Sequence, residues 1–242
     1  ALWVAAVAVA LHHDAAVRAA VHAALWGCFG LVFATVAHRM IPFFTGNVVR
    51  PYKYWRPMWL LWALLGGCAA HGLLEILGLS AWTWLVDLPL AGLGVYVSYR
   101  WGFSRSLKVW ILAMLHIGFA WFGVSLAIYG LHSLLQLSGH TDLGLVPLHI
   151  LMLGFIGTML LAMATRVTLG HSGRPLSADQ PTWVLFWLYH AVVLVRVAAE
   201  LLMPLAMVQA AYRPDALVFD EVHRLAREFK VSALVALRRL FD

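Results

Sequence analysis

One apolar run constrains the fold of this chain more than any other feature of the sequence. Residues 148–164 carry no charged side chain, and Arg166 follows shortly after the run. A helix crosses the bilayer core in about 20 mostly apolar residues, so the run predicts a transmembrane helix. A histidine at its start, His149, is unfavourable there unless it pairs, ligates or lines a cavity. Gly154 and Gly157 leave a helix face without bulk, which suits close approach by another helix or a flat cofactor.

The composition extends this prediction to the whole chain. Of the 242 residues, 63% are hydrophobic and 12% are charged, and the mean hydropathy is +0.83. Soluble domains carry about 25% charged residues, so the sequence indicates an integral membrane protein. We expect an all-α, polytopic transmembrane helix bundle of about six complete spans plus a partial N-terminal one. The complete spans are expected at residues 17–36, 58–79, 85–99, 109–131, 148–164 and 182–208.

The two ends of the chain differ from the middle. An apolar run begins at Ala1 without the charged start of a signal peptide, so we expect a fragment that begins inside a span. Residues 1–211 are expected to form the bundle. Residues 212–242 are expected to form an amphipathic helical tail, because Val222, Leu225 and Phe229 recur at helical spacing among charged residues.

Basic residues predict the orientation of the bundle. The connections at residues 38–57 and 100–108 are basic, as is the exit of the fifth span, whereas residues 132–145 contain neither Lys nor Arg. Basic loops stay on the cytoplasmic side of a membrane. The net charge of +6 therefore suits an anionic membrane surface, and no nucleic-acid partner is expected.

Twelve histidines are many for so apolar a chain, and the predicted spans sort the deeper ones into two levels. His116 and His190 enter from the basic side and lie about 10–14 Å deep at 1.5 Å of rise per residue. Neutral imidazoles at one depth on different helices suit haem iron or copper. His71 and His149 lie nearer the other side. Glu75 is one turn after His71, so the two share a helix face that suits a proton relay or a metal site.

Three blocks of sequence resemble the NnrS family of bacterial membrane proteins. The most specific is LHILMLGFIGTMLLAMATRVTLGHSGRPL at residues 148–176, and weaker blocks are HRMIPFFTGNVVR at 38–50 and LHIGFAWFG at 115–123. The likeness covers roughly residues 17–207 and leaves out the tail. NnrS-like proteins are longer than this chain, so the resemblance implies the C-terminal half of one.

The resemblance implies a haem-binding protein of nitric-oxide and nitrosative-stress tolerance, with copper as a second cofactor. It also implies a multi-pass protein of the bacterial inner (plasma) membrane, and it leaves open whether there is turnover. The expected partners are the lipid bilayer, haem, nitric oxide and a second copy of the chain. The expected cofactor-binding residues are His116, His149, His190, His171, Arg166, Arg174 and Arg39. The expected metal ligands are His116, His149 and His71.

Two other functions fit the same histidines. A proton-coupled transporter or channel would use them to carry protons and would lack haem absorbance. A quinol-linked haem–copper oxidoreductase would consume nitric oxide or oxygen. Arg196 and Glu200, four residues apart in the last span, are expected to neutralise each other, with a haem-propionate contact of Arg196 as the alternative. No phosphate-binding loop, nucleophile elbow or HExxH motif supports a hydrolase or ATPase.

Overall fold

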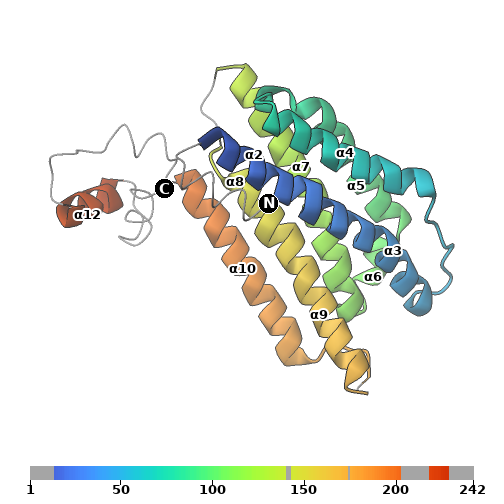
Figure 1. Ribbon diagram of the computed structural model, residues 1–242. Coiled ribbons are helices and arrows are strands. Elements are labelled where there is room, and N and C mark those ends of the chain that lie inside the picture. The colour runs from blue at the N-terminus through green and yellow to red at the C-terminus, as the bar shows by residue number, and fades with distance from the viewer. Residues whose placement is uncertain (1–13, 140–142, 174, 203–217, 229–242) are drawn as a thin grey trace.

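The computed structural model describes residues 14–139, 143–173, 175–202 and 218–228, and the regular structure in these ranges is helical. Figure 1 shows a bundle of long helices, with α12 (Val218–Glu228) lying apart from it. Five helical segments in the described ranges are long and apolar enough to cross a membrane: Ala15–Val48, Met58–Ile76, Trp110–Leu137, Val146–His171 and Gln180–Leu202. The expected all-α polytopic bundle is confirmed.

A sixth helix, α5 (Trp84–Arg100), packs in the same bundle and corresponds to the third expected span. Its 17 residues rise about 26 Å, slightly less than the ~30 Å of a bilayer core. It packs closely along α7 (Trp110–Leu137), because a Cβ built on Gly94 would lie 3.4 Å from the Cα of Gly123. The partial N-terminal span expected before residue 14 lies outside the described residues.

The central helix of the bundle is α7. It packs against α5, α3 (Leu31–Val48) and α9 (Thr158–His171), and 67% of its most apolar window is buried. The corresponding share for α10 (Gln180–Leu202) is 22%, and Figure 1 shows α10 at the edge of the bundle. Side chains of α7 therefore meet protein on most sides, whereas α10 leaves much of its surface open to lipid.

Two of the transmembrane segments are continuous helices with a π-helical insert. The first joins α2 (Asp14–Ala24), η1 (Leu25–Gly30) and α3. The second joins α8 (Val146–His149), η3 (Ile150–Gly157) and α9. Such inserts are rare and occur frequently at functional sites. The insert η3 coincides with the glycine-containing part of the apolar run on which the fold prediction was based.

Side chains from two neighbouring helices pack against Gly154 and Gly157 of η3. A Cβ built on Gly154 would lie 2.9 Å from the Trp121 ring of α7. A Cβ built on Gly157 would overlap the hydroxyl of Tyr189 on α10, which donates to the carbonyl of Leu153 at 2.7 Å. Side chains of α7 and α10 therefore approach these two glycines.

Three helix boundaries differ from the expectations by more than three residues. The fourth span, expected at residues 109–131, continues as α7 to Leu137, so His132 lies within a helix. The loop expected at residues 38–57 was wrong in its first part, because α3 continues to Val48 with Pro42 inside it. Proline is tolerated in membrane helices where neighbours recover the freed backbone group. The end of the fifth span, expected at residue 164, was also wrong, because α9 continues through Arg166 to His171. The connection that remains before α4 (Met58–Ile76) is residues 49–57.

The remaining elements are short. They are η2 (Ser80–Trp82), between α4 and α5, and α6 (Phe103–Ser106), between α5 and α7. Of the tail expected at residues 212–242, the structure describes residues 218–228, in which Val222 and Leu225 are buried and Asp220 and Arg227 are exposed. The rest of the expected tail lies outside the described residues.

Candidate functional site

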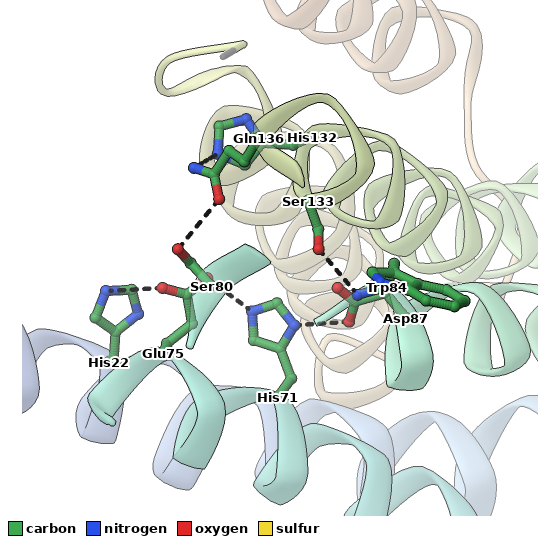
Figure 2. A network of polar contacts seen from close by, with 9 residues as sticks. All are labelled: His22, His71, Glu75, Ser80, Trp84, Asp87, His132, Ser133 and Gln136. Carbon is green, nitrogen blue, oxygen red and sulfur yellow. Dashed lines mark hydrogen bonds and ion pairs between the residues drawn. The ribbon is translucent and has the colours of Figure 1, made fainter. Parts of the chain in front are cut away.

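Four titratable side chains from α2, α4 and α5 form a chain of contacts (Figure 2). Nδ1 of His71 donates to Oδ1 of Asp87 at 2.6 Å, and both side chains are fully buried. Nε2 of His71 lies 3.8 Å from one oxygen of Glu75, and Nε2 of His22 lies 3.7 Å from the other. The expected shared face of His71 and Glu75 is confirmed, but the participation of Asp87 and His22 was not predicted.

Aromatic rings fix the orientation of the His71 imidazole. The Trp26 ring lies over it at a centroid distance of 3.8 Å, and the edge of Tyr129 meets it at 4.8 Å. Among the described residues, Nε2 of His71 and Oδ2 of Asp87 have no hydrogen-bond partner. Buried polar atoms are unfavourable without a partner, so this pair retains capacity for a proton or another polar group.

A cavity of about 270 Å³ connects this chain of contacts with the end of the bundle where α7 finishes. His22, Glu75, Tyr129 and His132 contribute to its lining. Figure 2 shows a second polar series beside it, in which Ser80 donates to Gln136 at 3.1 Å and Gln136 lies 3.0 Å from His132. The buried His71–Asp87 pair therefore contacts Glu75, whose side chain lines a cavity at one end of the bundle.

His116 is held by a hydroxyl from another helix. Thr45 of α3 donates its hydroxyl proton to the carbonyl of Ile41 at 2.7 Å, so its oxygen accepts from Nε2 of His116 at 2.9 Å. Both side chains are buried. A metal ligand must present a lone pair, whereas this nitrogen carries the proton. Ligation of iron through Nε2 of His116 would require this hydrogen bond to break.

We expect Thr45→Val to lower the free energy of unfolding by about 1 kcal/mol, because His116 loses a buried acceptor while the side-chain volume is kept. Thermal unfolding of the purified protein measures this. Thr35→Val is the matched control, since Thr35 donates to the carbonyl of Leu31 at 2.7 Å in the same way but is exposed. Equal losses for the two variants would show that the His116 contact contributes nothing.

The ring nitrogen that donates a hydrogen bond is Nδ1 in His190, whereas it is Nε2 in His116. Its Nδ1 donates to the carbonyl of Phe186 at 2.8 Å, so Nε2 carries the lone pair. The hydroxyl of Thr158 on α9 lies 3.4 Å from this Nε2, a long contact. The imidazole is 4% exposed and is surrounded by the rings of Phe186, Trp187 and Trp121 at centroid distances of 4.3, 5.6 and 6.2 Å.

His116 and His190 lie at similar depth but meet different partners. Trp110 at the start of α7 stacks on Trp183 of α10 at 5.4 Å, which fixes the level of the two helices. His116 is six residues after Trp110 and His190 is seven residues after Trp183, or about 9 and 10 Å of rise. The first imidazole contacts α3 and the second contacts α9.

His149, the last residue of α8, contacts two charged side chains of α10. Arg196 of α10 donates from Nε to Nε2 of His149 at 3.3 Å, and Nδ1 of His149 lies 3.5 Å from Glu200. Arg196 also pairs with Glu200, as expected from their spacing. Both ring nitrogens of His149 thus meet charged groups of α10.

The residues expected to hold haem propionates are dispersed. Arg166 is buried, and its guanidinium carbon lies 3.5 Å from the centre of the Phe44 ring of α3. Arg39 is exposed and lines a cavity with Tyr54 and Arg56. His171 is exposed at the end of α9, and Arg174 lies outside the described residues. Within the ranges the structure describes, no three His, Cys, Asp or Glu side chains come together as a metal site.

These observations define an all-α, multi-pass membrane protein whose buried histidines are held by hydroxyl, carbonyl and carboxylate groups. A family model described as "NnrS protein" matches residues 1–216, which is most of the chain. The chain belongs to the NnrS family, and this membership associates it with nitric-oxide stress. No curated protein and no solved structure matches it.

Proposed function

We propose that the chain is a haem-binding protein of nitric-oxide tolerance in the bacterial inner membrane. Membership of the NnrS family supports this. The structural observation that carries the proposal is the presentation of His190. Histidines that ligate metals donate the other ring N–H to a carbonyl or carboxylate, which fixes the tautomer and the direction of the lone pair. His190 has this arrangement, with Nδ1–H on the carbonyl of Phe186.

A second observation concerns the propionates that a haem would bring. Arg166 is buried, and its Nη1 has no hydrogen-bond partner among the described residues. Guanidinium groups bind carboxylates strongly and in a fixed geometry. Thr158, which contacts His190, and Arg166 are eight residues apart on α9, or about 12 Å of rise. Helix α9 therefore offers contacts for both the iron ligand and a propionate.

In this proposal the residues of the chain bind and orient the group. Phe186 and Thr158 hold the His190 ring so that Nε2 keeps its lone pair, and nearby aromatic rings exclude water. Haem iron would supply a coordination position for a diatomic ligand such as nitric oxide. Copper has less support, because the expected ligands His116, His149 and His71 each bind a different partner.

The purified chain tests this proposal directly. We expect a Soret band, iron in the preparation, and a shift of the band when nitric oxide is added. Copper analysis of the same sample decides whether a second metal is present, and the rate of nitric-oxide loss decides whether there is turnover. A colourless, iron-free preparation that still protects cells against nitric oxide would refute haem binding.

The contacts around His71 favour a second candidate function, proton-coupled transport. A series of titratable side chains leads from the cavity at His22 and Glu75 to the buried His71–Asp87 pair. Such residues inside a membrane commonly form proton relays. In liposomes, Glu75→Gln and Asp87→Asn should then abolish a proton-dependent flux, whereas His223→Ala, an exposed histidine on α12, should not. Unchanged flux in the first two variants would reject this function.

A further inference from the structure

A basic cavity of about 520 Å³ lies between the connection at residues 49–57 and the turn after α5. Lys53, Arg100 and Arg105 contribute to its lining, and no acidic residue does. Both segments lie at the basic side of the bundle, which the distribution of charge places toward the cytoplasmic leaflet. The cavity therefore concentrates positive charge at the level of lipid headgroups.

Contacts within the protein hold two of these cations in place. Arg105 donates from Nη1 to the carbonyl of Pro51 at 2.7 Å, which ties α6 to the connection at residues 49–57. The guanidinium of Arg100 lies 4.7 Å from the centre of the Trp55 ring. The ion pairs in the described part of the chain involve other residues, so the charges of Arg100, Arg105 and Lys53 are not neutralised by carboxylates there.

Tyr52 adds a hydrogen-bond donor to the same cavity. Its hydroxyl oxygen is buried without a hydrogen-bond partner in the described structure, and its ring packs beside Gly46 of α3. Burial raises the pKa of Tyr52 to about 12, with Tyr54 adding to the effect and Arg105 opposing it. The hydroxyl therefore stays protonated at neutral pH. A buried donor beside three cations suits an anionic acceptor such as a phosphate oxygen.

An apolar groove of about 520 Å³ adjoins this cavity and shares Tyr99, Phe103 and Ser104 with it. The groove runs along α5 and α7, where small residues such as Gly92 and Ala127 leave space. Between Ala120 and Ala127 it follows about 10 Å of the rise of α7. The side of the bundle that carries it exposes apolar residues, including Val95.

We propose that the basic cavity and the apolar groove together form a binding site for one anionic glycerophospholipid. Lys53, Arg100 and the Tyr52 hydroxyl bind the phosphate, and an acyl chain lies in the groove between α5 and α7. Because the two cavities share lining residues, the basic cavity that would hold the headgroup adjoins the apolar groove that would hold the acyl chain. None of the residues that line the two cavities is a histidine, so the site is distinct from the position of the proposed iron ligand His190.

The 242-residue chain, stripped of lipid in detergent, tests this inference by native mass spectrometry. Titration with phosphatidylglycerol should give one retained lipid per chain at concentrations where phosphatidylcholine is not retained. A basic residue near an anionic lipid contributes about 1 kcal/mol, or about fivefold in affinity. The double substitution Lys53→Gln and Arg100→Gln should therefore weaken phosphatidylglycerol binding about 25-fold. Lys108→Gln removes an exposed charge outside the cavity and should leave the affinity unchanged.

The groove is tested by a separate pair of variants. A Cβ built on Gly92 meets nothing within 4 Å, so Gly92→Leu should fill the groove without disturbing the fold and weaken lipid retention. Gly66→Leu, equally free of contacts but on α4, should not. Equal retention of the two lipids, or an unchanged affinity in the double variant, would overturn the proposal. Competition by inorganic phosphate as strong as by the lipid would show a headgroup site only and would likewise overturn it.

Discussion

Asp87→Leu is expected to lower the free energy of unfolding by about 3 kcal/mol, the loss typical when one partner of a buried pair is removed. The substitution leaves the Nδ1–H of His71 without its acceptor, 2.6 Å away in the native protein, in a fully buried position. Trp26 and Tyr129 pack against the His71 ring and prevent it from turning to another acceptor without disturbing the core. Chemical unfolding in detergent, followed by tryptophan fluorescence, measures the loss.

Two further variants separate the hydrogen bond from the loss of a carboxylate. Asp87→Asn keeps an acceptor oxygen of the same shape, so its loss should be about 1 kcal/mol. Asp220→Leu, on the exposed face of α12, should change the stability by less than about 0.5 kcal/mol. A loss for Asp87→Leu as small as that for Asp220→Leu would show that the buried pair does not stabilise the bundle.

Gly157→Ala should destabilise the protein by about 2 to 3 kcal/mol, because the added methyl group overlaps the Tyr189 hydroxyl. Tyr189 must then move away, and its hydrogen bond to the carbonyl of Leu153 is lost. The movement separates α10 from η3 at the level of the His190 ring, so retention of any cofactor held there should fall as well. Thermal unfolding and cofactor content are measured on the same sample.

The cause of this loss can be isolated by a double-mutant cycle. In the Tyr189→Phe background the overlapping oxygen is absent, so Gly157→Ala should lose at least half of its effect. Gly66→Ala is the control for glycine replacement in a helix, since a Cβ there meets nothing within 4 Å. It should stabilise the protein slightly, because alanine favours a helix more than glycine does. An undiminished effect in the Tyr189→Phe background would contradict the assigned clash.

The transmembrane helices could be predicted from the sequence because hydropathy and length report directly on them. The boundaries that failed are those where polar or charged residues, or proline, interrupt an apolar stretch. A basic connection was expected from residue 38, yet α3 continues past Arg39 and Pro42 to Val48. In a membrane, a helix satisfies its backbone internally, so it can continue through such residues when tertiary contacts favour it. His38 shows one such contact, donating to the carbonyl of Pro57 at 3.1 Å.

The sequence predicted which types of residue form the candidate site, but it did not predict which side chains contact one another. The sequence indicated buried histidines at two depths, and it indicated the His71–Glu75 face. It could not reveal that Thr45 engages His116 or that Phe186 fixes the His190 tautomer, because those contacts depend on how helices pack and on ring orientation. Asp87 could have been found, since a lone carboxylate in an apolar span is itself a signal.

Haem content per chain, compared between His190→Ala and His223→Ala, tests the proposed function most directly. Both variants remove one imidazole, but His190 is buried with Nε2 available, whereas His223 is exposed on α12. We expect His190→Ala to lose most of its Soret absorbance and bound iron, while His223→Ala retains both. Equal haem in the two purified variants would contradict the assignment of His190 as an iron ligand.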